Sequence, residues 1–374
     1  MFKQSRNYWG MLVLVLLLSM TPLSSILFPQ KTIQTVKASG IHLNVRKRIL
    51  LKGEKFTLIL KGTKNKPVFA SADPAVATVS KKGVVRAVGG GETIITARTA
   101  KKTCRCKITI HDTMDIIVFA GQSNMTNVGR ASEAPDVTPG TAYEAIPKSG
   151  KISHLVEPFG VGQKKTTAKK SAQGATLVSA FVNAYYKKAK TPVLAMNTAK
   201  GNTSIGQWSA SYYKEIVTDV RAMEKLLRKK GLKKGNVYVV FYQGENDAMN
   251  SIVTTVYRKH MELFMSNIQS ECDVSRCFII RISNDLNNLE SYDKIAAVQT
   301  RICMEDPRFV MAATIGSSFG VSYYQGDGVH LTQKALNKVG EQAGRMTGTY
   351  TVTGKEPSMK DPRYHNTYRS LCNN

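Results

Sequence analysis

The chain has 374 residues, of which 42% are hydrophobic, and this length exceeds what one hydrophobic core usually organises, so two folded domains are expected. Its 28 glycines, 12 prolines and 8% aromatic residues exclude a collagen-like, low-complexity or disordered chain. The 53 Lys and Arg outnumber the 26 Asp and Glu, so the formal net charge of +27 favours contact with polyanions such as nucleic acid, acidic polysaccharide or an anionic cell envelope.

Residues 1–38 have the pattern of a secretory signal peptide. Lys3 and Arg6 precede an apolar run over residues 11–20 in which Ser19 is the one polar residue. Residues 36–38 (Val-Lys-Ala) are small or apolar at the two positions that a signal peptidase reads. The alternative is an uncleaved N-terminal anchor, because the apolar stretch extends through residues 23–28 to nearly the length that spans a bilayer.

Both alternatives place the rest of the chain outside the cytoplasm, so the predicted location is secreted or at the extracellular cell surface. This location argues against nucleic acid as a partner, and membrane contact is expected only if the signal is not cleaved. Without the four cations of the signal, the formal net charge is still +23. We therefore expect the basic surface to contact an anionic cell wall or an acidic glycan.

Residues 39–111 have the pattern of short β-strands. Apolar and polar residues alternate at 56–61 and 104–110, and glycines at 83 and 89–91 supply turns. Several short strands at such spacing predict a small all-β sandwich. The segment carries sixteen Lys and Arg against three acidic residues, an excess that is more than half of the net positive charge outside the signal.

Part of this segment resembles a known domain. Residues 71–80 (Ser-Ala-Asp-Pro-Ala-Val-Ala-Thr-Val-Ser) and 82–85 (Lys-Gly-Val-Val) are similar to the bacterial immunoglobulin-like domain of the intimin/invasin type (group 2). The resemblance implies an immunoglobulin-like sandwich at residues 39–111 that serves as a spacer or a surface-attachment module. A passive stalk with a solvated basic face is favoured over a specific binding site for a polyanion. Clusters of like charges are common on solvent-exposed faces.

From residue 115 onward, continuous apolar runs alternate with helical patterns. Such runs are typical of strands buried on both faces of a parallel sheet. They cover residues 116–119, 193–196, 237–241, 278–280 and 310–313, and the helical patterns cover 177–188, 213–229, 253–268 and 294–303. The alternation predicts the α/β class, with a three-layer α/β/α domain and a parallel central sheet over residues 112–350 and a C-terminal tail at 351–374.

Three polar motifs follow predicted strands or precede the last helix, where reactive residues collect in this architecture. They are residues 121–125 (Gly-Gln-Ser-Asn-Met), 244–247 (Gly-Glu-Asn-Asp) and 327–330 (Asp-Gly-Val-His). A serine on a glycine-tightened turn can project into a cleft as a nucleophile. A neutral imidazole can accept the serine proton, and an Asp three residues before the histidine can hold its far ring nitrogen.

Together with residues 201–205 (Gly-Asn-Thr-Ser-Ile) and 242–243 (Tyr-Gln), these motifs resemble the SGNH (GDSL-like) hydrolase superfamily and, within it, the sialate O-acetylesterase-like carbohydrate esterases. The resemblance spans about residues 115–345. It implies that Ser123 is the nucleophile, His330 the general base and Asp327 the residue that orients the imidazole.

The same resemblance implies an oxyanion hole. Its donors would be the backbone N–H groups of Ser123 and Gly201 and the side chain of Asn246, with Gln243 as a second candidate donor. Amide donors aimed at the developing oxyanion contribute about 3–4 kcal/mol each. The related esterases commonly have Gly-Gly-Thr-Ser where this chain has Gly-Asn-Thr-Ser, so Asn202 is a departure within this loop.

Capping is the alternative interpretation of the same residues. Ser123 could cap the helix after its strand, Asp327 the helix over residues 332–346, and Asn246 could stabilise a turn. Three separate caps would not require a histidine at position 330 as well, which favours the catalytic interpretation.

Four residues are candidate substrate contacts: Gln122, Trp208, Tyr323 and Tyr324. An aromatic face can pack on a pyranose ring, although core packing or a loop lid explains each aromatic residue equally well. Tyr323 and Tyr324 are favoured because they directly precede the catalytic loop.

No metal site and no cofactor are predicted. The six cysteines contain no Cys-x-x-Cys pair, and the six histidines show no His-x-x-x-His spacing. Cys272 and Cys277 could close a small disulfide loop, and unpaired thiols are the alternative.

The sequence thus predicts a secreted or surface-held carbohydrate O-acetylesterase that removes acetyl groups from glycans by a Ser-His-Asp acyl-enzyme mechanism. The expected partner is an acetylated carbohydrate substrate. The alternative is a surface glycan-binding adhesin whose hydrolase fold does not turn over a substrate.

Overall fold

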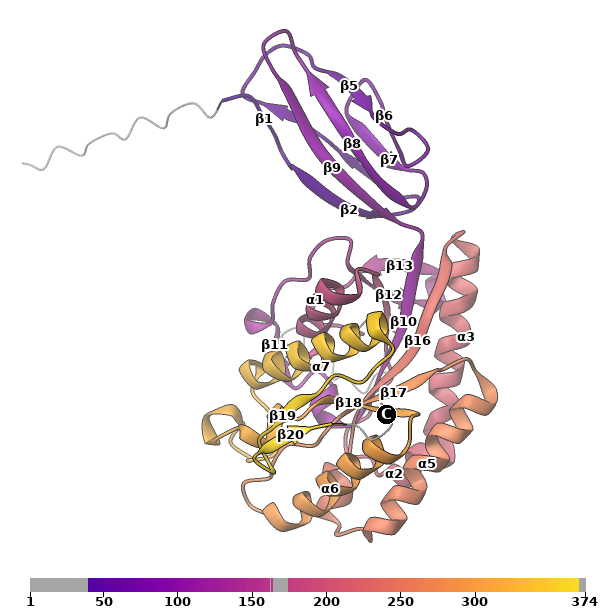
Figure 1. Ribbon diagram of the computed structural model, residues 1–374, viewed down its shortest axis with the longest axis vertical. Coiled ribbons are helices and arrows are strands. Elements are labelled where there is room, and N and C mark those ends of the chain that lie inside the picture. The colour runs from indigo at the N-terminus through magenta and orange to yellow at the C-terminus, as the bar shows by residue number, and fades with distance from the viewer. Residues whose placement is uncertain (1–39, 162, 164–173, 370–374) are drawn as a thin grey trace, which may run out of the picture. The chain divides into compact units, whose positions relative to one another are not determined.

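The computed structural model describes residues 40–161, 163 and 174–369, which form a β-rich region followed by an α/β region (Figure 1). The predicted signal or anchor at residues 1–38 lies outside the described residues. None of the helices in the described part of the chain is both long and apolar enough to cross a membrane.

The β-rich region, residues 40–111, consists of short strands around a core of its own. Ile95, Ala97, Cys106 and Ile108 on its two longest strands are fully buried, and the residues between them face outward. The alternation in the sequence therefore reflects strands with one buried face. The assignment to the immunoglobulin-like domains stays a prediction.

The strands of this region form three groups. A four-stranded sheet has the order β2 (Lys47–Leu51), β9 (Thr103–His111), β8 (Gly91–Arg98) and β5 (Val68–Ser71). A three-stranded sheet has the order β3 (Lys55–Thr57), β7 (Val84–Ala87) and β6 (Ala77–Val79), and β1 (His42–Leu43) pairs with β4 (Leu60–Lys61).

The α/β region is built on a seven-stranded sheet in the order β13-β12-β15-β10-β16-β17-β18. Its strands are β10 (Thr113–Gly121), β12 (Ala142–Ile146), β13 (Lys151–His154), β15 (Val193–Asn197), β16 (Lys233–Tyr242), β17 (Arg276–Ile280) and β18 (Phe309–Ala313). Neighbouring strands are parallel except β13, which runs antiparallel to β12 at the edge.

The apolar runs of the sequence correspond to β10, β15, β16, β17 and β18, so the predicted parallel sheet is confirmed. The edge hairpin β12-β13 was not predicted. In β12 only Ala142, Tyr143 and Ala145 are buried, and β13 has no buried residue, so the hairpin has no continuous apolar run.

Helices cover both faces of the sheet, which confirms the three-layer architecture (Figure 1). On one face α1 packs against α7, and on the other α3, α5 and α6 follow one another. The bounds are α1 (Val178–Ala189), α2 (Ile205–Gln207), α3 (Tyr213–Lys229), α4 (Glu245–Met249), α5 (Thr254–Glu271), α6 (Leu289–Glu305) and α7 (Gln333–Thr353). Two short strands, β11 (Gly129–Arg130) and β14 (Gly174–Ala175), pair beside this framework.

The C-terminal residues pack onto the α/β region, contrary to the predicted tail at 351–374. Helix α7 continues to Thr353, and β19 (Met359–Asp361) pairs with β20 (Asn366–Tyr368). Met359 and Tyr368 are 4% and 3% exposed and belong to the main hydrophobic core. The hairpin contributes so few apolar side chains that its sequence has no periodic pattern. Residues 370–374 lie outside the described residues.

Glycines allow α7 to lie directly against α1. An added Cβ at Gly340 or Gly344 would overlap the carbonyl oxygens of Leu177 and Phe181. A backbone approaches another backbone this closely only where a side chain is absent. The glycines of α7 are therefore part of the packing between these two helices.

We expect Gly344→Ala to lower the free energy of unfolding by about 1–3 kcal/mol, because the added methyl group forces two packed helices apart. This cost outweighs the higher helix propensity of alanine, which is worth about 1 kcal/mol. Urea unfolding measures the change. Gly320→Ala is the matched control, since its Cβ would meet no atom within 4 Å, and an unchanged stability of Gly344→Ala would contradict the close packing.

Candidate active site

The nucleophile turn follows the central strand β10. Gly121 has φ +131°, and an added Cβ there would overlap the main chain of Tyr242 on β16, so this sharp exit from the strand requires glycine. The Gln122 N–H donates to the Tyr242 carbonyl at 2.9 Å. Ser123 then begins a short 3₁₀ turn, Ser123–Met125, and is half-buried. The cap position of this turn is Gln122, so Ser123 does not have the capping role considered as the alternative.

Asp327 and His330 form a hydrogen-bonded pair in the loop before α7. The Asp327 Oδ2 and His330 Nδ1 atoms are 2.6 Å apart. The other oxygen, Oδ1, accepts from the backbone N–H groups of Val329 at 3.0 Å and His330 at 2.9 Å. Partial burial opposes ionisation, but these bonds outweigh it and hold the pKa of Asp327 below its ordinary value. The cap of α7 is Thr332, so capping does not explain Asp327.

Asn124 joins the nucleophile turn to the catalytic loop. Its Oδ1 accepts from the Leu331 N–H at 3.0 Å, and its Nδ2 lies 3.4 Å from the Val329 carbonyl. Leu331 and Val329 flank His330, and Asn124 directly follows Ser123. One buried side chain therefore brings the predicted nucleophile and the predicted base into the same place. No role was assigned to Asn124 from the sequence. Its position next to Ser123 was the feature of the sequence that could have indicated one.

Glu245 is a second residue beside the predicted site to which the sequence analysis assigned no role. It begins α4, is 2% exposed, and its Oε1 accepts from Asn124 Nδ2 at 3.0 Å. Among the described residues, its Oε2 has no hydrogen-bond partner. Burial raises the pKa of Glu245, against the opposing effects of Asn124 and of a positive charge on His330. A buried carboxyl group thus lies against Asn124 and close enough to His330 to interact with its charge. Its place in the Gly-Glu-Asn-Asp motif was the signal in the sequence.

Gln122 aligns Asn246 with the nucleophile turn. Its Oε1 accepts from the backbone N–H groups of Asn246 at 3.1 Å and Gly244 at 3.4 Å. Asn246 is half-buried, and its Oδ1 accepts from Asn250 Nδ2 at 3.2 Å, which leaves its own Nδ2 as a donor. This arrangement suits the predicted role of the Asn246 amide next to Ser123.

The loop that carries Gly201 is held at the end of β10. The Lys200 N–H donates to the Gly121 carbonyl at 2.8 Å, and Gly201 is exposed, with no atom within 4 Å of an added Cβ. Asn202 has φ +56°, in the left-handed region that asparagine tolerates better than most residues. Asparagine is therefore compatible with the backbone conformation at position 202.

Gln243 does not suit its predicted role as a second oxyanion donor. Its side chain is 0% exposed, and its Nε2 donates to the Thr203 carbonyl at 2.9 Å and to a carboxylate oxygen of Asp247. Both amide hydrogens are therefore committed inside the protein. Asp247 also accepts from the Ile205 N–H, so Gln243 and Asp247 support the loop that follows Gly201.

Three predicted substrate contacts are buried, which corrects their assignment. Gln122 is 2% exposed, and its side chain accepts from the Asn246 N–H at the start of α4. Trp208 is 0% exposed, and its Nε1 donates to Thr203 Oγ1 at 2.9 Å. Tyr324 is 6% exposed, and its hydroxyl accepts from the Asn284 N–H at 3.1 Å. Core packing, the alternative considered for the aromatic residues, explains Trp208 and Tyr324.

Tyr323 remains a candidate substrate contact. It is half-buried and stacks on Phe319 with ring centroids 4.6 Å apart. The Nζ atoms of Lys334 and Lys338 lie 5.1 and 5.9 Å from its ring centroid. An aromatic face with two neighbouring cations therefore lies beside the catalytic loop.

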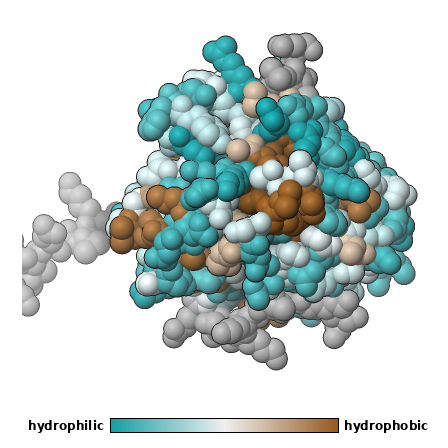
Figure 2. Space-filling view, turned by 90° about the horizontal axis from the view of Figure 1, so that it is seen from below, coloured by the Kyte–Doolittle hydropathy of each residue, from teal (hydrophilic) through white to brown (hydrophobic). Residues whose placement is uncertain are grey.

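Apolar side chains are also exposed in the segments that follow β16 and β17. Met249, Val253, Leu286 and Leu289 are 45%, 62%, 37% and 54% exposed. Figure 2, viewed from the lower end of Figure 1, shows apolar atoms gathered near the middle of a largely hydrophilic face.

No group of three or more His, Cys, Asp and Glu in the described part of the chain is arranged to hold a metal ion. Cys104, Cys106, Cys272 and Cys277 are free thiols, so the considered pairing of Cys272 with Cys277 does not occur. Cys372 lies outside the described residues.

Comparison with known proteins bears on this site. The sequence profile of the family described as "Carbohydrate esterase, sialic acid-specific acetylesterase" matches residues 113–348. A search of curated proteins found no match. Similar solved structures include a protein from Arabidopsis thaliana, with 18% identity, a TM-score of 0.49 and coverage of 62% of this chain and 96% of that one.

Two further structures are similar. NanS has 15% identity and a TM-score of 0.45, with coverage of 66% of this chain and 99% of that one. XAC1771, a carbohydrate acetylesterase from Xanthomonas citri, has 14% identity and a TM-score of 0.43, with coverage of 84% of this chain and 75% of that one. Family membership rests on the profile match, which covers more than half of the chain. The chain therefore belongs to the carbohydrate esterase family of sialic acid-specific acetylesterases, and its α/β region has the SGNH fold.

Proposed function

We propose that the protein is a secreted or surface-held carbohydrate O-acetylesterase that forms an acetyl-enzyme on Ser123. The observation that carries the proposal is the Asp327–His330 pair, 2.6 Å apart, which Asn124 holds against the nucleophile turn. A histidine oriented by a carboxylate beside a serine on a tight turn is the arrangement that activates a hydroxyl group for acyl transfer.

The mechanism has two steps. With its Nδ1–H donated to Asp327, His330 uses Nε2 to take the proton of Ser123 as the Oγ atom attacks the acetyl carbonyl carbon. His330 then gives that proton to the departing sugar hydroxyl, which leaves the acetyl group on Ser123. Water attacks the acetyl-enzyme in the second step, with His330 again as base, and releases acetate and free Ser123.

The oxyanion of both tetrahedral intermediates would be held by three donors. These are the backbone N–H groups of Ser123 and Gly201 and the Nδ2 of Asn246. Gln122 supports this assignment, because it accepts from the Asn246 N–H and lies next to Ser123 in the chain. Donors that are already in place when charge develops stabilise the transition state more than the ground state.

The proposed substrate is an acetylated glycan, such as acetylated xylan, sialic acid or a cell-wall polysaccharide. The family description names sialic acid, and Tyr323, which stacks on Phe319, is a partly exposed aromatic residue that a sugar could contact. The exposed apolar side chains around residues 249–253 and 286–289 suit the apolar faces of a sugar ring and its acetyl group.

The β-rich region would add attraction to an anionic surface without contributing to the chemistry. Its sixteen Lys and Arg against three acidic residues favour an anionic wall or an acidic glycan as the contact. All residues assigned to catalysis lie beyond it, in the α/β region.

The test is acetate release by the purified protein from acetylated xylan, O-acetylated sialic acid, acetylated wall polysaccharide and p-nitrophenyl acetate. We expect turnover of p-nitrophenyl acetate and of at least one glycan, because the activated serine attacks any acetyl ester that reaches it. Glycan binding without acetate release from any of the substrates would contradict the esterase and support the adhesin instead.

A further inference from the structure

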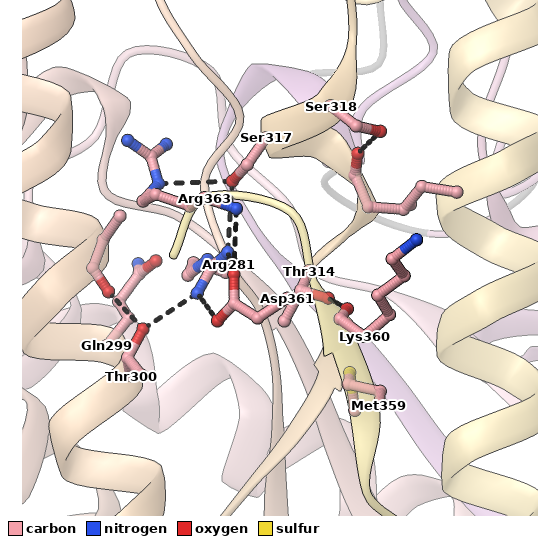
Figure 3. Close-up of polar contacts among 12 residues, drawn as sticks. Arg281, Gln299, Thr300, Thr314, Ser317, Ser318, Met359, Lys360, Asp361 and Arg363 are labelled. Carbon is pink, nitrogen blue, oxygen red and sulfur yellow. Dashed lines mark hydrogen bonds and ion pairs between the residues drawn. The ribbon is translucent and has the colours of Figure 1, made fainter. Parts of the chain in front are cut away.

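A buried polar cluster joins the C-terminal hairpin β19-β20 to the end of β17, and the proposed mechanism does not use it (Figure 3). Arg281, the first residue after β17, donates to both carboxylate oxygens of Asp361 at 2.6 Å. The two side chains are 0% and 1% exposed. Because a bidentate pair fixes orientation as well as distance, the hairpin is held firmly at the carboxyl end of the sheet.

Arg363 connects the cluster to Ser317 and Asn284. Its backbone N–H donates to Asp361 Oδ1 at 3.1 Å, its Nε to Ser317 Oγ at 3.2 Å, and its Nη2 to Asn284 Oδ1 at 2.8 Å. The side chain is 8% exposed, and its Nη1 contacts the Asp293 carboxylate. Burial lowers the pKa of Arg363 to about 10, so the guanidinium stays charged at neutral pH.

Asn284 belongs to a loop, residues 281–288, that we call the β17 loop. Its N–H donates to the Tyr324 hydroxyl at 3.1 Å, and its Nδ2 donates to the Ser317 carbonyl at 3.2 Å. Tyr324 is buried and pairs through a β-bridge with Leu331, the residue after His330. Asn284 therefore connects Arg363 to the chain on both sides of the catalytic pair.

The β17 loop also contacts the catalytic loop directly. The Leu286 N–H donates to the Gly328 carbonyl at 3.3 Å, and Asn287 Nδ2 lies 3.5 Å from the Asp327 carbonyl. Gly328 has φ +73°, and an added Cβ there would meet Asn287 Nδ2 at 3.0 Å. The turn that carries Asp327 and His330 thus rests against the β17 loop.

We propose that Arg363 is a positioning residue for the catalytic pair, acting through Asn284 and the β17 loop to hold the turn of Asp327 and His330 against the nucleophile turn. Arg281 has a different role, because its bidentate bond to Asp361 anchors the hairpin itself. Arg363 contacts no reacting atom, so its effect is on the orientation of the imidazole. The proposal rests on the proposed Ser-His-Asp function.

The experiment measures kcat and KM of the full chain on p-nitrophenyl acetate, with active sites counted from the burst of p-nitrophenol. For Arg363→Ala we expect kcat per active site to fall about tenfold, with KM within about twofold of wild type, since orientation matters mainly in the transition state. Lys360→Ala is the matched control. Lys360 is an exposed cation on the same hairpin, and its side chain points away from the cluster in Figure 3.

Asn284→Ala removes the other end of the connection and should lower kcat by a similar factor. If Arg363 acts through Asn284, the double variant should lose no more than the larger single loss, because residues that act through one contact are not additive. A purely structural role would lower the burst amplitude and the unfolding midpoint and leave kcat per active site unchanged. Should Arg363→Ala fail to fold, Asn284→Ala and Arg363→Lys carry the same expectation.

Two outcomes overturn the proposal. One is a wild-type kcat per active site in Arg363→Ala or, if that variant does not fold, in Asn284→Ala. The other is fully additive losses in the double variant. A wild-type protein that produces neither a burst nor acetate would instead refute the proposed esterase function, so the two failures are distinguishable.

Discussion

Replacement of Ser123 by alanine is expected to lower kcat for acetate release by at least about 10,000-fold while the protein stays folded. Alanine lacks the oxygen that accepts the acetyl group, so the acetyl-enzyme cannot form at this position. The side chain is half-buried at the start of a short turn, so its removal leaves the core intact. Steady-state rates on p-nitrophenyl acetate and on an acetylated glycan measure the loss, and circular dichroism checks the fold.

His330→Ala should cause a similar loss, and the double variant should be no worse than Ser123→Ala, because nucleophile and base act as a unit. Ser322→Ala is the matched control, since Ser322 is an exposed serine in the segment before the catalytic loop. Retention of more than a few per cent of the wild-type rate in Ser123→Ala would refute the nucleophile.

Replacement of Asn246 by alanine is expected to lower kcat by about 100- to 1000-fold with little change in KM. The Asn246 amide would donate to an oxyanion that exists only in the transition state and intermediates, so the ground-state complex loses little. Gln122 would still hold the backbone of Asn246 through the N–H bond at 3.1 Å, so the variant removes the donor without moving α4.

Asn246→Asp sharpens this test, because the aspartate keeps the shape of asparagine and cannot donate. It should lose at least as much activity as Asn246→Ala, since a negative charge would face the oxyanion. Asn366→Ala, at the exposed start of β20, is the control. A fall in kcat of less than about fivefold in both Asn246 variants would show that the oxyanion hole does not use this side chain.

The parallel sheet was predictable because its strands are buried on both faces. Such strands require unbroken apolar sequence, and the runs at β10, β15, β16, β17 and β18 are of this kind. The hairpins β12-β13 and β19-β20 were not predictable. They lie at the edge of the sheet or outside it and bury few residues, so their sequences carry no period.

The contact between Asp327 and His330 was predictable for a different reason, namely their closeness in the chain. Asp327 and His330 lie three residues apart in one tight loop, so their contact depends on local backbone geometry that the chain itself determines. The left-handed conformation at Asn202 is also local, and it explains why asparagine can replace glycine there.

Sequence alone determined the class of the fold, the five strands of the central sheet that have unbroken apolar runs, and the residues of the candidate triad, because burial and short-range contacts leave patterns in neighbouring positions. Only the tertiary structure decided that Asn124 joins Ser123 to the loop of His330, that Gln243 is committed to Thr203 and Asp247, and that Trp208 is core. It also decided that the C-terminal hairpin reaches the β17 loop through Arg363 and Asn284. Most of these contacts join residues that are far apart in the chain. Polar side chains such as these occur both at the surface and in buried hydrogen-bonded sites, so their partners are known only once the strands and loops are packed together.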